Sequence, residues 1–166
     1  ACVLVSMDTT HIKTKFQRLG ARAKIRPLAQ NRWQPESGRM VIDVRHDRHG
    51  EFFDIQADQD ADVEVLDVQP RDRHLLLMIR RPNQRPHQPD IKDKLLCGHD
   101  ERHWFVAGVP EQASTVVTAK EALKPELVRD REQGTKGKRS KRPRRKTDVF
   151  IRQGEWFFIP APDVQV

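Results

Sequence analysis

From Met40 onward, short apolar runs alternate with charged turns along the chain. Each run spans roughly four to seven residues, is rich in Val, Ile, Leu, Phe or Trp, and is bounded by Gly, Pro, Asp or His, which is the pattern of β-hairpins. The runs form four consecutive pairs: 41–45 with 51–56, 63–69 with 74–80, 94–98 with 103–109, and 149–152 with 155–160. We therefore expect about six to eight antiparallel strands.

The second run of two of these pairs is more continuously apolar than the first. Residues 75–79 and 104–107 contain no polar position, whereas apolar and acidic residues are interspersed along 63–68. An unbroken apolar strand is typical of burial on both faces, while an alternating strand has one face in water. We therefore expect the sheet to be covered on its second side by a helix or by another sheet.

One helix is predicted over residues 118–133. Thr118 and Glu121 have the spacing of a capping box, in which each side chain accepts a hydrogen bond from the other residue's free backbone amide. Gly134 stands where such a helix would end. Pro125 lies inside the pattern, and it either kinks this helix or begins a second short one as its first residue.

The segment before Met40 has a weaker pattern, with isolated apolar positions among charged ones. Phe16 and Leu19 are placed to begin a short helix that Gly20 would end, and the rest is expected to be irregular or edge structure. The chain therefore divides into an N-terminal segment of undetermined structure, 1–39, and a single β-rich domain, 40–166. The expected fold class is mainly β (α+β): an antiparallel barrel or sandwich built from about four hairpins, with one helix packed on it.

The positive charge of the chain is concentrated in one segment. The formal net charge is +7, and residues 136–146 hold eight cationic side chains and no acid, so the remainder is close to neutral. Because such a composition cannot bury an apolar face, we expect residues 135–147 to form a basic arm that is disordered on its own. The residues expected to contact phosphates are Lys136, Lys138, Arg139, Lys141, Arg142, Arg144, Arg145 and Lys146, extended by Arg152 on the adjoining hairpin.

A dense basic run is effective against a polyanion, because each neutralised phosphate releases counterions. The arm contains no aromatic residue and so offers no base stacking. Our preferred hypothesis is a non-catalytic nucleic-acid-binding protein without a cofactor, and the sequence does not separate DNA from RNA. A different hypothesis for the same run is an adaptor that docks an acidic protein surface.

The histidines suggest an alternative. Five of the seven lie in or beside three of the hairpin turns, which share one end of the sheet if the strands run up and down in sequence. Cys97, His99 and His103, together with His74, would be a chemically sensible zinc set. Such a rim would belong to a zinc-stabilised domain or, with one position open to water, to a zinc-type enzyme. None of these spacings matches an established metal signature, and histidine is common in turns.

Other features narrow the remaining function classes. The eight glycines are scattered, so no phosphate-cradling loop is formed, and no Gly-x-Ser-x-Gly nucleophile turn occurs. Two cysteines, Cys2 and Cys97, cannot supply a disulfide framework, which indicates a reducing compartment: the cytoplasm, or the nucleus of a eukaryote. No apolar run approaches the roughly 20 residues that cross a bilayer, so we expect no membrane partner.

Overall fold

Two compact units make up the chain, Ala1–Ala122 and Leu123–Val166. The computed structural model describes residues 9–29, 38–58, 60–83, 85, 87–126 and 128–129, and the backbone of 151–153 and 156–158. The sequence pattern predicts a boundary after residue 39. In the structure, residues 12–23 contribute apolar side chains to the core of the first unit.

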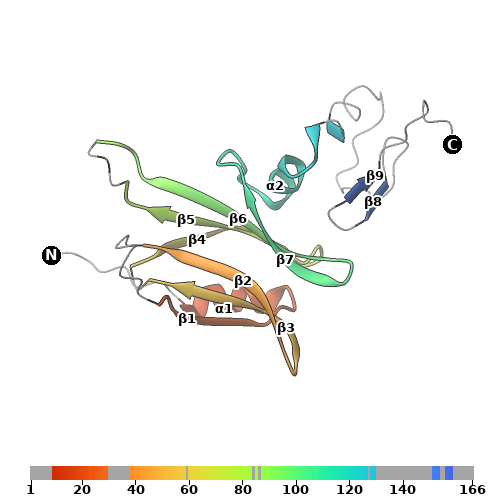
Figure 1. Ribbon diagram of the computed structural model, residues 1–166, viewed down its shortest axis with the longest axis horizontal. Helices are drawn as coiled ribbons and strands as arrows, with labels where there is room; N and C mark the ends of the chain where they lie inside the picture. The colour runs from red at the N-terminus through yellow and green to blue at the C-terminus, as the bar shows by residue number, and fades with distance from the viewer. Residues whose placement is uncertain are drawn as a thin grey trace. The chain divides into compact units, whose positions relative to one another are not determined.

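The seven described strands of the first unit form two sheets, with strand orders β1-β3-β2 and β4-β5-β6-β7 (Figure 1). The strands are β1 (Ala23–Pro27), β2 (Met40–Asp47), β3 (Gly50–Ala57), β4 (Asp62–Gln69), β5 (His74–Arg81), β6 (Ile91–Asp100) and β7 (His103–Val109). Two helices accompany them, α1 (Thr9–Arg18) and α2 (Val116–Ala122). The second unit contains the hairpin of β8 (Ile151–Gln153) and β9 (Trp156–Phe158).

The expected fold class is confirmed. The protein is mainly β (α+β), and its two larger sheets pack in a sandwich-like arrangement that does not close into a barrel. All four predicted hairpins are present as antiparallel pairs, namely β2–β3, β4–β5, β6–β7 and β8–β9. The exception to the antiparallel pattern is β1, which pairs with β3 in parallel at the edge of its sheet.

The N-terminal helix is longer than the pattern predicted and begins earlier. Helix α1 starts at Thr9, and Phe16 lies near its end. Ile12, Phe16 and Leu19 repeat at intervals of four and three residues, so all three face the core. The predicted stop is confirmed: Gly20 has a φ of +76°, a left-handed conformation that suits glycine at the end of a helix.

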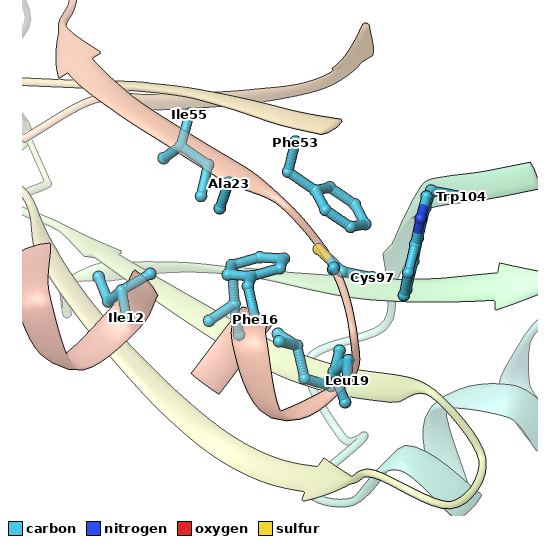
Figure 2. Packing of buried hydrophobic residues seen from close by; sticks show 11 residues of the cluster. Ile12, Phe16, Leu19, Ala23, Phe53, Ile55, Cys97 and Trp104 are labelled. Carbon is cyan, nitrogen blue, oxygen red and sulfur yellow. The ribbon is translucent and has the colours of Figure 1, made fainter. Parts of the chain in front are cut away.

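The main core lies between the two sheets and against α1 (Figure 2). Phe53 of β3 is fully buried there, and its ring centroid lies 4.7 Å from that of Phe16 in α1 and 5.4 Å from that of Trp104 in β7. The other buried members are Ile12, Leu19, Ala21, Ala23, Ile55, Leu75, Leu77 and Cys97. Phe53 of the central strand β3 thus packs against both α1 and β7.

A second core covers the opposite face of the four-stranded sheet. Leu76 of β5 packs there against Val116 and Ala119 of α2, while its neighbours Leu75 and Leu77 point into the main core. The expectation of burial on both faces is therefore confirmed for β5, with a sheet on one side and a helix on the other.

Helix α2 begins earlier and ends sooner than the predicted span of 118–133. Its capping residue is Thr115, whose Oγ1 accepts a hydrogen bond from the Thr118 amide at 3.2 Å. In return, Thr118 Oγ1 accepts from the Thr115 amide at 3.0 Å. The reciprocal cap exists, but three residues before the predicted position, because Thr115 and Thr118 also have that spacing.

Pro125 begins a separate helical turn in the second unit. Its carbonyl oxygen accepts hydrogen bonds from the amides of Val128 at 3.0 Å and Arg129 at 3.1 Å. The sequence left open whether this proline kinks the predicted helix or begins a second short one, and the structure shows that it begins a second one.

Candidate functional site

Three hairpin turns lie at the same end of the first unit, as the up-and-down strand order predicts (Figure 1). The carbonyl of Arg73, in the β4–β5 turn, accepts a hydrogen bond from the His99 amide of β6 at 3.1 Å. The guanidinium Nε of Arg73 donates to the carbonyl of Leu19, just after α1, at 3.3 Å. We call this end, which comprises residues 18–22, 47–51, 70–74 and 99–104, the turn end.

The β2–β3 turn is joined to the others through Glu51. Its carboxylate accepts hydrogen bonds from His103 Nδ1 at 2.7 Å and from the Trp104 amide at 2.9 Å. Burial acts to raise the pKa of Glu51, but these two hydrogen bonds outweigh it, so that the pKa is lowered. An ionised Glu51 thus connects the three-stranded sheet to β7.

Four arginines at the turn end are exposed and form no ion pair within the described part of the chain. They come from different elements: Arg18 from α1, Arg48 from the β2–β3 turn, Arg71 from the β4–β5 turn and Arg102 from the β6–β7 turn. Only Arg48 has a side-chain hydrogen bond, to His49 Nε2 at 2.9 Å. Their charges are therefore available to an external anion.

The opposite end of the same unit is different, because most of its described arginines are neutralised internally, with Arg85 between β5 and β6 as an exposed exception. The ion pairs there are Arg39–Asp58 at 3.3 Å, Arg80–Asp62 at 3.1 Å, Arg80–Glu64 at 3.2 Å and Arg81–Asp93 at 2.6 Å. The exposed positive charge is thus unevenly distributed, although the net charge outside the arm is close to zero.

The aromatic side chains near the turn end are covered. Arg73 lies over the ring of Trp104, 4.5 Å from its centroid, and His99 contacts the same ring edge-on at 4.8 Å. Trp104 is consequently only 8% exposed. Burial, followed by the charge of Arg73, lowers the pKa of His99, so this imidazole is neutral at pH 7.

Phe52 lies on the outer face of the three-stranded sheet, and two cations cover it. Lys24 and Arg22 lie 4.0 Å and 5.5 Å from its ring centroid. Both are held by Asp47, which receives two hydrogen bonds from Arg22 and one from Lys24 at 2.7–2.9 Å. Hydrogen bonds from Arg22 and then Lys24 lower the pKa of Asp47 well below its ordinary range. Both cations are therefore engaged within the fold, and Asp47 offsets one of their two positive charges.

A second carboxylate on that outer face, Asp54, is buried between two arginines. Arg26 donates to its two oxygens at 2.9 and 2.6 Å, and the Nε of Arg45 lies 3.0 Å from Oδ2. The hydrogen bonds from Arg26 lower the pKa of Asp54 despite its burial. Asp54 therefore remains ionised and binds Arg26 and Arg45 on either side.

We expect Asp54→Asn to lower the free energy of unfolding at pH 7 by about 2 kcal/mol, because hydrogen bonds to charged groups each contribute about 1.5–3 kcal/mol and water screens the half-exposed arginines. The lowered pKa adds stability above the ordinary carboxyl pKa of about 4, and this is lost as the pH falls through the folded-state pKa. Urea unfolding between pH 2 and 7 should show the difference between the two proteins shrinking in acid. Asp43→Asn, at the exposed neighbouring position across the strands, is the matched control. A constant difference at all pH values would contradict this role.

The structure does not bring the four residues of the predicted zinc set together. Cys97 is fully buried in the main core, and burial raises the pKa of its thiol far above the ordinary value. His99 lies on that same side of the sheet, whereas His103 is exposed and bonded to Glu51. His74 lies on the opposite face, against Phe105. Among the described residues, no three His, Cys, Asp or Glu side chains gather as a group suited to a metal ion.

The predicted phosphate-contacting residues of the arm lie outside the described residues. These are Lys136, Lys138, Arg139, Lys141, Arg142, Arg144, Arg145 and Lys146. Arg152 is described in its backbone only, which lies in β8 opposite Phe157.

Sequence reasoning missed the arginines of the turn end. Each of the three turns contains an arginine beside an acid, as in Asp47-Arg48 and Asp72-Arg73, so the turns read as locally neutral. The structure shows that some of these acids are engaged elsewhere: Asp47 binds Arg22 and Lys24, and Asp72 binds Lys120 at 2.8 Å. The sequence does hold one signal that could have revealed them: each of these three hairpin turns contains an arginine.

Comparison with known proteins gives no relative for this chain: no protein-family model, no curated protein and no solved structure matches it. In the part of the chain that the structure describes, no helix has both the length and the apolar character needed to cross a membrane. Any function must therefore be argued from the residues and their geometry.

Proposed function

We propose that this protein binds nucleic acid without catalysing a reaction, and that the basic arm supplies most of the phosphate contacts. The observation that carries the proposal is the run 136–146, with eight positive charges and no acid. A run of this kind favours polyanions, because binding releases the counterions condensed on the phosphates. About five simultaneous phosphate contacts would make binding steeply salt-dependent.

The charge pattern of the first unit supports this assignment. Many of its acids are engaged by cations of the same unit, including Asp47 by Arg22 and Lys24, and Asp54 by Arg26. An acid that already holds one or two cations is a weak competitor for further ones. These acids therefore leave the charges of the arm available to an external partner.

The free thiol of the described part fits a reducing compartment. Cys97 is unpaired and fully buried in the main core. Disulfides are rare in the cytoplasm and nucleus, where thiols stay reduced. We accordingly place the protein in the cytoplasm, or in the nucleus of a eukaryote.

Neutralising the arm is expected to remove most of the binding. The variant Arg139→Gln, Lys141→Gln, Arg142→Gln and Arg144→Gln should weaken binding to duplex DNA by at least about a hundredfold at 0.1 M salt, because each lost contact costs up to about eightfold there. The slope of log affinity against log salt should become shallower by about 3. Labelled DNA and RNA, single- and double-stranded, titrated from 50 to 300 mM salt, would measure both quantities.

A matched control removes the same charge elsewhere. Lys13→Gln, Arg85→Gln, Lys92→Gln and Arg129→Gln change four exposed cations outside the arm and the turn end, none ion-paired within the described ranges. This control should retain nearly all of the binding. The proposal fails if the intact protein binds no nucleic acid, or if the arm variant and the control bind equally well. Binding to an acidic peptide, but not to nucleic acid or heparin, would instead establish the adaptor hypothesis.

A further inference from the structure

We infer that the turn end is a second phosphate-contacting surface, in which the guanidinium groups of Arg18, Arg48, Arg71 and Arg102 bind the backbone of the nucleic acid. This inference rests on the proposed function, and it names a site on the folded domain that the charge run alone does not reveal. All four side chains are exposed and without an ion pair in the described ranges.

The four arginines are presented by a connected framework. Hydrogen bonds join the β4–β5 turn to both the end of α1 and β6, through the side chain and the carbonyl of Arg73. Glu51 ties β3 to β7 just beside the other two turns. Because these links run between elements far apart in the chain, they fix the relative positions of the backbone segments that carry the arginines, which reduces the conformational entropy lost when an anion binds.

Two of the acids nearest to these arginines are engaged by other cations. Asp47, beside Arg48, is occupied by Arg22 and Lys24, and Asp72, beside Arg71, is occupied by Lys120. Asp47 and Asp72 are thus engaged by cations of the fold, while the neighbouring guanidinium groups stay exposed. This arrangement leaves unpaired guanidinium groups at one end of a nearly neutral body.

Arg102 is in a less favourable position than the others. Asp100 and Glu101 precede it in the same turn, and their charges lower the positive potential around it. We therefore expect Arg18, Arg48 and Arg71 to contribute most of the binding at this surface.

The chemistry of the surface favours the phosphate backbone over the bases. The aromatic rings that could stack on bases are covered, Trp104 by Arg73 and His99, and Phe52 by Lys24 and Arg22. Contacts to phosphate position a nucleic acid but carry no sequence information. The turn end should therefore strengthen binding equally for all sequences.

The test compares three variants of the full chain on the same duplex DNA. The turn-end variant carries Arg18→Gln, Arg48→Gln, Arg71→Gln and Arg102→Gln, and it is measured beside the arm variant and the four-charge control described above. We expect the turn-end variant to bind at least about tenfold more weakly at 0.1 M salt, with a salt slope shallower by about 2–3. The loss should be the same on two duplexes of unrelated sequence, and the melting temperature should be unchanged.

The outcomes separate this inference from the proposed function. Equal binding by the turn-end variant and the control would overturn the inference and leave the role of the arm intact. A loss confined to one duplex sequence would overturn it as well, because phosphate contacts do not discriminate. If the intact protein binds no nucleic acid, both the proposed function and the inference fail. Arg18→Lys, Arg48→Lys, Arg71→Lys and Arg102→Lys, which keep the charge, should restore most of the affinity.

Discussion

Replacing Phe53 by alanine is expected to lower the free energy of unfolding by about 4 kcal/mol, within the range of about 3–5 kcal/mol for buried Phe→Ala substitutions. Phe53 is fully buried and contacts the rings of Phe16 and Trp104. The cavity would open where α1 and both sheets meet, and three elements cannot all move to fill it. Since domains of this size are stable by about 5–15 kcal/mol, much of the total would be lost.

Urea unfolding followed by circular dichroism measures this effect. Two controls calibrate it: Phe53→Leu, which leaves a smaller void and should cost about 1–1.5 kcal/mol, and Val117→Ala at an exposed position of α2, which should change the stability by less than about 0.5 kcal/mol. A loss below about 1 kcal/mol for Phe53→Ala would show that the sheets do not pack on this ring.

The second large effect is expected at Gly98, where even a methyl group has no room. A Cβ at this position would lie 2.3 Å from Cδ2 of His74 and 2.6 Å from its Nε2. The imidazole cannot move aside easily, because it is buried against Phe105 and its Nδ1 is bonded to the Asp72 carbonyl. We expect Gly98→Ala to lower the free energy of unfolding by about 2–3 kcal/mol, as overpacking of a filled core does.

A double-mutant cycle identifies the cause of that loss. His74→Ala removes the ring that collides with the new methyl group, so the double variant should be more stable than the sum of the two single losses predicts, by about 1–2 kcal/mol. Gly108→Ala in β7, where an added Cβ has no atom within 4 Å, is the matched control. Strict additivity would show that the collision with His74 is not the source of the destabilisation.

The local sequence pattern was sufficient to predict the hairpins and the C-terminal end of α1. The alternation of apolar runs and turns places β2–β3, β4–β5 and β6–β7 within a few residues of their observed bounds. In the N-terminal segment the same reasoning placed the end of α1 but not its start, because only Ile12 and Phe16 form its buried face in a polar stretch. A short helix of this kind is stabilised by the core that receives it and not by its own sequence. Helix α2 was misplaced because two pairs of residues have capping-box spacing.

For the candidate sites, too, the sequence predicts some features and the tertiary structure decides others. The sequence by itself determined a mainly β fold, its hairpins and the concentration of charge in residues 136–146, because composition and periodicity report on neighbours along the chain. The common end of three turns followed only from an assumed strand order, which the structure supplies. Only the tertiary structure decided which charges remain unpaired. Arg22 and Asp47, or Lys120 and Asp72, are far apart in sequence and meet through the fold. These contacts engage Asp47 and Asp72, and so the fold, not the composition, leaves the neighbouring Arg48 and Arg71 without an ion pair among the described residues.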